Sequence, residues 1–197
     1  DFMRELKLGK APSYLALQML ILTATRTSDV LNARWDEVDT TQRLWTVPKE
    51  RTKTKLRDHR VPISANLAIV LKRAAEFQCS EFVFPGHRHG RPLSNMTLLK
   101  IMRSMGYGCT KDCMRGDAVP HGFRSTFRDW AGETTSYPGD VIEMALAHEI
   151  KNKVEAAYRR GDLFAKRRKM MQEWGEYATK KQADVISLGK LNPNRSS

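Results

Sequence analysis

The sequence predicts a mainly helical α+β domain with one small antiparallel β-sheet. Apolar residues recur at helical spacing along most of the chain. Two short runs, "RLWTVP" (43–48) and "HRVPIS" (59–64), are of β type, and the basic stretch "KERTKTKLRD" joins them as an expected hairpin. The length of 197 residues suits one sizeable core and leaves little room for a second.

Helical patterns precede the hairpin. The chain opens directly into one at Asp1, which favours a fragment of a longer protein. Segment 11–39 then indicates two helices interrupted near "TATRT". The first is largely apolar and should be buried, whereas Thr27 or Ser28 can cap the second.

The chain returns to helical spacing after the hairpin. Ser64 can cap the next helix, and Ser94 or Asn95 can open the one after it. A turn at "TTSYPG" separates two later helices. The expected helical segments are 64–77, 95–106, 121–133, 140–149 and a last one from about Val154 through Tyr177.

The charge balance favours an anionic partner. Thirty-four Lys and Arg residues stand against 22 Asp and Glu residues, for a formal net charge of +12. Nucleic acid is the commonest partner of such a chain. A membrane is disfavoured, because the sequence has no apolar run of spanning length and no basic segment with a broad aromatic-rich face.

The three cysteines suggest a reducing cytoplasm and no disulfide framework. Cys109 and Cys113 together with His121 would supply only three metal ligands, at a spacing that matches no common zinc pattern. Loop and core thiols are the favoured interpretation, and no metal is expected.

A phosphodiester can be cut without a metal when cationic hydrogen-bond donors stabilise the negative charge that its oxygens carry in the transition state. Arginine suits this role because its planar fork binds two oxygens and stays charged. On a helix, His121 and Arg124 lie three residues apart and share a face. Alone this pattern is weak, since most such matches are exposed polar faces.

The order of the motifs is more specific. "TATRTSDVL", "RTKTKLRDHRVPIS", "HGFRSTFRDWAGE" and "LAHEIKNKVEAAYRRGDLFAKRR" follow one another along the chain. His148 lies 24 residues after Arg124, and Tyr158 lies ten after His148. Over roughly residues 1–178 the chain closely resembles the catalytic domain of tyrosine recombinases, in particular phage and prophage integrases. This resemblance implies their DNA breaking-rejoining fold.

The resemblance implies a role for each matching residue. Tyr158 would attack the scissile phosphate and form a 3′-phosphotyrosine link. Lys53 would protonate the 5′ leaving oxygen, and His121 would assist proton transfer to and from the tyrosine. The residues expected on the non-bridging phosphate oxygens are Arg26, Arg124 and His148. Neither ATP nor a metal is needed, because the covalent link keeps the bond energy.

Several assignments stay open or secondary. Lys55 would point to the same face as Lys53 if both lay in a strand, so the catalytic lysine is one of the two, with Lys53 favoured. Asp29 is expected to orient Arg26 through a salt bridge. His59 is expected to contact DNA or to be a strand residue. The remaining residues expected to bind DNA are Lys55, Arg159 and Arg160.

The implied function is site-specific DNA recombination for integration or excision of a phage or other mobile element. The expected partners are double-stranded attachment sites, a homotetramer passing through a Holliday junction, and a host DNA-bending protein. Residues 179–197 would form a tail that docks on a neighbouring subunit, and N-terminal DNA-binding domains are expected to be absent from this chain. The alternatives are a catalytically inactive DNA-binding remnant and type IB topoisomerase-like relaxation.

Overall fold

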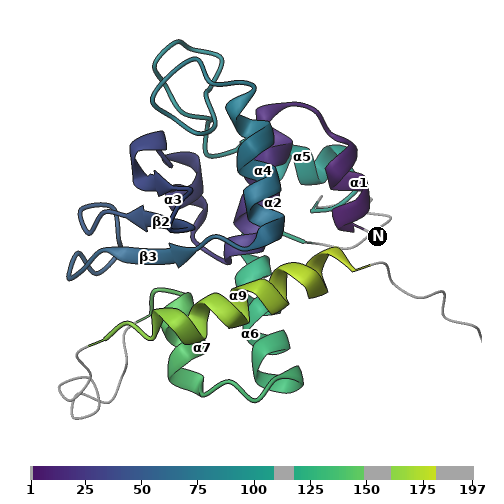
Figure 1. The fold of residues 1–197 in the computed structure, drawn as a ribbon. Coiled ribbons are helices and arrows are strands. Elements are labelled where there is room, and N and C mark those ends of the chain that lie inside the picture. Colours follow the sequence, from purple (N-terminus) through teal and green to yellow (C-terminus); the bar gives the residue numbers. More distant parts are fainter. Residues whose placement is uncertain (1, 109–117, 149–160, 181–197) are drawn as a thin grey trace, which may run out of the picture.

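The computed structural model describes residues 2–108, 118–148 and 161–180. The fold is mainly helical (Figure 1), and the strands in these residues form one three-stranded antiparallel sheet, in agreement with the predicted α+β class. The elements are α1 (Phe2–Leu8), α2 (Pro12–Thr23), α3 (Thr27–Leu31), η1 (Trp35–Glu37), β1 (Val38–Asp39), β2 (Leu44–Val47), β3 (His59–Pro62), α4 (Ala65–Ala75), α5 (Thr97–Ser104), α6 (Gly122–Thr134), α7 (Gly139–Ala145) and α9 (Phe164–Thr179).

Helix α2 forms the centre of the fold. Pro12 begins it, and every residue from Leu15 to Thr23 is buried, which explains why its sequence is apolar on all sides. It packs against α4, α5 and α9. The helix ends where Ala24 adopts a left-handed conformation with φ 50°, and this turns the chain sharply into α3.

The predicted hairpin is confirmed. Strand β2 pairs antiparallel with β3, with Trp45 opposite Val61 and Val47 opposite His59. These four side chains are buried on one face of the sheet. The 11 residues 48–58 connect the two strands. The short edge strand β1, which the sequence pattern did not indicate, completes the sheet beside β2.

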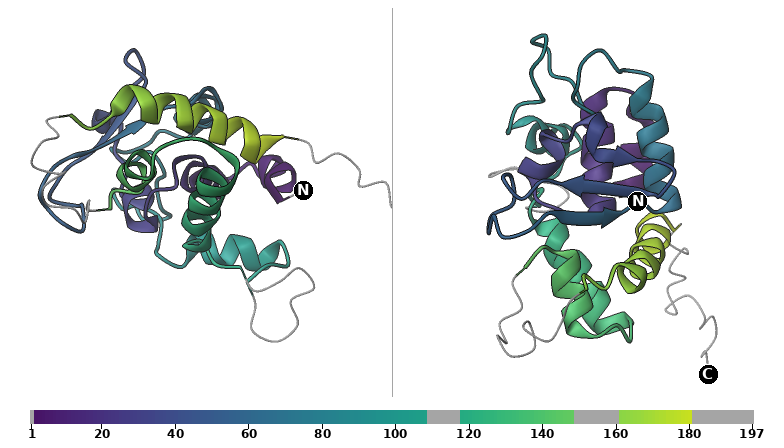
Figure 2. Two further views of the ribbon diagram at one scale, coloured as in Figure 1. Left: turned by 90° about the horizontal axis from the view of Figure 1, so that it is seen from below. Right: turned by 60° about the vertical axis from the view of Figure 1, so that its left-hand side comes forward.

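Helices α6, α7 and α9 form a second layer beneath the sheet and α2 (Figure 1, and Figure 2, right). The two layers are joined in the core, where the Trp174 indole donates to the Ile21 carbonyl at 2.7 Å. Trp130 packs against Trp174 with ring centroids 5.2 Å apart. Among the helices described, none is both long and apolar enough to span a bilayer.

Three local predictions require correction. Neither Thr27 nor Ser28 caps α3, because Arg26 occupies the N-cap position. The N-cap of helix α5 is Met96, and not Ser94 or Asn95 as the sequence indicated. The last helix begins at Phe164, since Leu163 has a left-handed backbone that ends any continuous helix from the preceding residues. The Ser64 cap of α4 is confirmed, with its side chain accepting from the Leu67 amide.

Candidate functional site

Two arginines from different layers meet at the start of α3. The Arg26 guanidinium donates to the Ala147 carbonyl at 3.1 Å. Arg124, on the first turn of α6, donates to the neighbouring Leu146 carbonyl and to the Ala24 carbonyl, both at 2.7 Å. Because Leu146 and Ala147 are consecutive, the chain after α7 holds both guanidiniums side by side.

The backbone at these contacts is unusual. Ala24 and Ala147 both have left-handed conformations, with φ values of 50° and 51°. Such a conformation is uncommon for a residue with a side chain and persists only where the surroundings hold it. Here each of the two residues turns a carbonyl toward an arginine, so the strained backbone forms part of the site.

His148 completes the cluster and is itself oriented. Its Nε2 lies 3.0 Å from Arg124 Nη2, and its Nδ1 lies 2.6 Å from the Glu143 carboxylate. A carboxylate accepts only, so Nδ1 donates, and in the neutral ring Nε2 accepts from Arg124. Arg128 donates to the other oxygen of Glu143 at 3.0 Å.

Burial and neighbouring charges determine the pKa values of Arg124 and Glu143. Burial lowers the pKa of Arg124 to about 10, and the Arg26 charge adds to this, so Arg124 stays charged at neutral pH. Burial acts to raise the pKa of Glu143. The hydrogen bonds from His148 and Arg128 outweigh it and lower that pKa overall, so the carboxylate stays ionised.

Asp29 supports Arg26 in a different way from the one predicted. Its carboxylate accepts from the Arg26 backbone amide at 3.3 Å, as expected for an acidic residue in the first turn of a helix. In the described part of the chain it forms no ion pair within 4.0 Å of the Arg26 guanidinium, which turns instead to Ala147. Burial raises the pKa of Asp29, and the nearby arginines oppose that rise.

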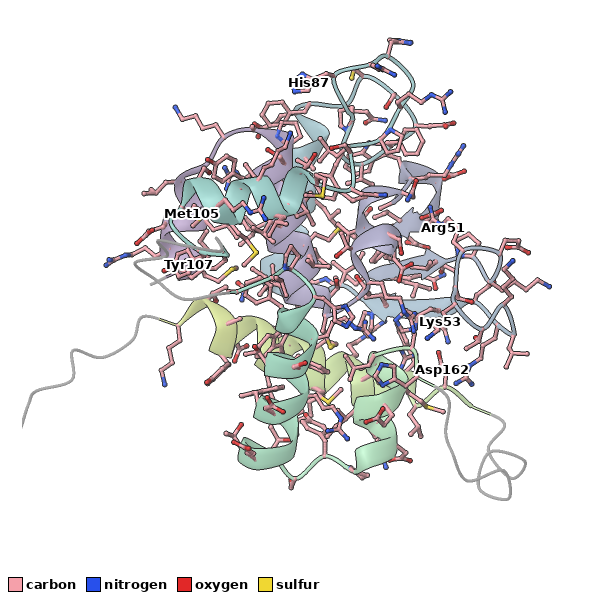
Figure 3. All side chains as sticks on the ribbon, turned by 180° about the vertical axis from the view of Figure 1, so that it is seen from behind. Arg51, Lys53, His87, Met105, Tyr107 and Asp162 are labelled. Atoms are coloured by element: carbon pink, nitrogen blue, oxygen red, sulfur yellow. The ribbon has the colours of Figure 1, made fainter. Side chains whose placement is uncertain are left out.

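Lys53 and Lys55 lie in the connection between β2 and β3, and both are exposed. The expectation that they share one face of a strand is wrong, because neither is in a strand and Lys55 has a left-handed φ of 54°. Figure 3 shows Lys53 on the same side of the molecule as Arg51 and Asp162.

His59 is a strand residue and not an accessible DNA contact. It is the first residue of β3 and is only 8% exposed. Burial lowers its pKa to about 3, and the charges of Arg167, Arg26 and Arg124 contribute. Because the ring is buried and uncharged, it neither reaches an outside phosphate nor attracts one by charge, so the structure favours the strand-residue alternative over the DNA contact.

His121 is exposed at the N-cap of α6, one helical turn before the buried Arg124. The structure therefore brings together Arg26, Asp29, Arg124 and His148, with His121 at the same helix start. Tyr158, Arg159 and Arg160 lie outside the described residues, as do Cys109 and Cys113.

The sequence pattern of the phage integrase family matches residues 1–163. The chain belongs to this family. It is 35% identical to prophage integrase IntA of Escherichia coli K12 over 89% of this chain and 41% of that protein. It is 33% identical to the integrase of Enterobacteria phage P4 over 91% of this chain and 43% of that protein. The chain thus spans less than half the length of these relatives.

Solved structures show the same fold. XerA recombinase superposes with a TM-score of 0.60 at 15% identity, over 90% of this chain and 62% of that one. A lambda integrase tetramer bound to a Holliday junction gives 0.53 at 16% identity, over 72% of this chain and 42% of that one. The tyrosine recombinase fold predicted from the motifs is confirmed.

Glu143 and Arg128 also belong to this candidate site, although the sequence pattern did not single them out. Glu143 precedes His148 by five residues, a spacing that does not place two residues on one helix face. The contact forms because the chain leaves α7 through the left-handed Ala147 and folds His148 back. No periodic signal in the sequence could have revealed it.

Proposed function

We propose that this integrase-family chain cuts and rejoins DNA strands in site-specific recombination, through a 3′-phosphotyrosine intermediate, during integration or excision of a phage or mobile element. The observation that carries the proposal is the pair of guanidiniums of Arg26 and Arg124 beside His148. Within the described residues neither guanidinium is paired with a carboxylate, although their like charges repel.

Such an arrangement favours an anion between the two arginines. Arginine has five N–H donors. The described contacts use three of them on Arg124 and one on Arg26, which leaves donors for non-bridging oxygens. A bound phosphodiester would relieve the repulsion, and the donors, already oriented by carbonyls, would not need to reorganise as charge develops.

In the proposed reaction the Tyr158 oxygen attacks phosphorus, and the bond from phosphorus to the 5′ oxygen breaks. Lys53 gives its proton to the leaving oxygen, and the tyrosine proton passes to His121 or to solvent. The reverse attack by a 5′ hydroxyl of another strand restores the phosphodiester. No bond energy is lost, so the cycle needs no ATP, and the two guanidiniums supply the cationic charge that a metal would otherwise provide.

The assembly is proposed from relatives. Lambda integrase is a tetramer on a Holliday junction, and the Tn1549 transposon integrase has been solved with circular intermediate DNA. We propose double-stranded attachment sites and a tetramer for this chain, with residues 1–178 as the catalytic unit and 179–197 as a docking tail. The net charge of +12 suits the DNA.

The test is to trap the covalent adduct. The protein, with any sequence that naturally precedes Asp1, is mixed with a duplex carrying the end of its encoding element. A nick just beyond the scissile phosphate lets the short 5′-hydroxyl strand diffuse away, so the adduct accumulates. Tyr158→Phe is the matched control, because it keeps the ring and removes only the attacking oxygen.

A denaturant-resistant protein–DNA band from the wild type alone is the expected result. No band from either protein, together with salt-sensitive DNA binding, would identify a binding remnant that has lost catalysis. A band from both would show that a different residue attacks. Relaxation of supercoiled DNA without strand exchange between two sites would instead favour the topoisomerase-like activity.

A further inference from the structure

Lys53 stands on a long exposed connection, which is a poor support for a catalytic acid. The 11 residues 48–58 join β2 to β3, and the Lys53 side chain is exposed. A general acid must lie within hydrogen-bond reach of the oxygen that it protonates. A misplacement of about 1 Å can reduce the rate by about 10²-fold. The connection therefore needs contacts with the rest of the fold that fix its position.

Arg51, two residues before Lys53, makes such contacts. Its Nη2 donates to a Glu37 carboxylate oxygen at 2.7 Å, and its Nη1 donates to the Asn32 carbonyl. The Arg51 side chain is 24% exposed and that of Glu37 only 8%. This ion pair is partly buried and is hydrogen-bonded on both sides, unlike the surface pairs that contribute little.

Glu37 is itself fixed. The oxygen that accepts from Arg51 also accepts from the indole of Trp45 at 3.1 Å and from the Arg34 backbone amide at 3.2 Å. Trp45 is fully buried in β2, so the carboxylate is attached to the core. Arg51 is thus anchored to a rigid part of the sheet and not to another surface side chain.

The second contact of Arg51 leads to the phosphate site. Asn32 is the C-cap of α3, and Arg26 is the N-cap of the same helix. This helix has only five residues, which gives it a length of about 7.5 Å. Arg51 therefore joins the Lys53 connection to the short rigid element from which Arg26 reaches the proposed phosphate. The positive charge of Arg51 also acts to lower the pKa of the buried Asp29 within that helix.

Neighbouring contacts keep the connection in shape around Lys53. Thr52 is 6% exposed, and its hydroxyl donates to the Lys49 carbonyl at 2.9 Å. The same hydroxyl accepts from the Lys55 amide at 3.1 Å, so the residues on both sides of Lys53 are tied together. Arg51 attaches this small closed unit to the rest of the fold.

We propose that Arg51, held by Glu37, is a positioning residue that places the Lys53 ammonium beside the leaving 5′ oxygen. The inference rests on the proposed function. Arg51 acts through Lys53, so its loss should impair the step that needs a proton on the leaving group and should spare attack and phosphate binding.

A sulfur atom in place of the bridging 5′ oxygen tests this directly, because a thiolate leaves without needing a proton. Adduct formation is timed with the normal and the sulfur-bridged nicked duplex, using the protein with any sequence that naturally precedes Asp1. The variants are Arg51→Gln, Arg51→Lys, Lys53→Ala and the double variant Arg51→Gln/Lys53→Ala. Arg51→Lys keeps a charge for Glu37 and serves if Arg51→Gln does not fold.

Arg34→Gln is the matched control. Its guanidinium pairs with Glu81 at the surface, at 2.6 Å, and only its backbone amide contacts Glu37. Thermal unfolding of each variant shows whether the domain is intact. The control should form the adduct at the wild-type rate on both substrates.

With normal DNA, Arg51→Gln is expected to slow adduct formation by about 10–10²-fold, because general acid catalysis contributes about 10²–10⁴-fold. On the sulfur-bridged duplex the rate of adduct formation by Arg51→Gln should recover to within about threefold of the wild-type rate, and the rate of Lys53→Ala should recover likewise. The double variant should be no slower than Lys53→Ala alone, since two residues that act through one ammonium are not additive.

Equal slowing of Arg51→Gln and Arg51→Lys on both substrates, with wild-type cleavage intact, would overturn the inference and leave the proposed function standing. A double variant slower than Lys53→Ala on normal DNA would overturn it too. Absence of an adduct from the wild type on either substrate would refute the proposed function, and this inference with it.

Discussion

Replacement of the buried His59 should make the protein less sensitive to acid. In the unfolded chain a histidine titrates near pH 6.5, whereas burial lowers the pKa of His59 to about 3, with Arg167 and Arg26 adding to the effect. Between these values the unfolded state binds the proton and the folded state does not. Stability therefore falls as pH falls through this window.

The size of the effect follows from the two pKa values. At about pH 4.5 the unfolded ring is two pH units below its pKa and the folded ring is still neutral, so protonation favours unfolding by about 2.7 kcal/mol. At pH 7 the same contribution is only about 0.2 kcal/mol. His59 should thus account for about 2.5 kcal/mol of the stability lost between the two conditions.

His59→Leu removes this titration and also removes the buried Nε2, which has no hydrogen-bond partner. Urea unfolding followed by tryptophan fluorescence at pH 7 and pH 4.5 gives the loss for each protein. The variant should lose about 2.5 kcal/mol less than the wild type. His87→Leu, at an exposed loop histidine, is the control and should lose as much as the wild type. Equal losses for His59→Leu and the wild type would refute the reasoning.

Three further predictions concern the arginine network. Arg124→Lys replaces the planar fork, whose two nitrogens each reach a different carbonyl, by a single ammonium nitrogen. It should therefore leave a buried carbonyl unpaired and destabilise the fold by about 1–3 kcal/mol. It should also slow adduct formation by about 10²-fold or more. Thermal unfolding and adduct timing check the two effects, and wild-type values in both would contradict them. Glu143→Gln replaces a charged acceptor of His148 by a neutral one, a difference of about 1 kcal/mol, so adduct formation should slow about fivefold with stability little changed. An unchanged rate would show that this orientation is unimportant. Arg167→Met should lower the free energy of unfolding by about 3 kcal/mol, because Arg167 is 2% exposed and its loss leaves Asp162 without its closest cation. A loss below about 1 kcal/mol in urea unfolding would mean that Asp162 finds a sufficient partner elsewhere.

Local patterns in the sequence predicted the larger part of the fold. Alternation identified β2 and β3, and helical spacing with capping residues such as Ser64 identified most helices. The errors occur where backbone geometry overrides propensity. Leu163 adopts a left-handed conformation and starts α9 later than the apolar pattern indicated. Arg26 takes the N-cap position that Thr27 or Ser28 would have filled by propensity alone.

The motifs and their order were enough to identify the family and to name Arg26, Arg124 and His148 before any geometry was known. Residue types at fixed spacing carry this information, because arginine and histidine are the side chains suited to binding phosphate oxygens and transferring protons.

Only the tertiary structure decided how those side chains are held. The contacts of Glu143 with His148 and of Arg51 with Glu37 join residues through bends in the chain, and no helical or strand period relates them. The burial of His59 likewise depends on what packs over β3. Periodicity reports which face of an element is apolar, whereas a site is made by the distances between faces of different elements, and these exist only once the chain has folded.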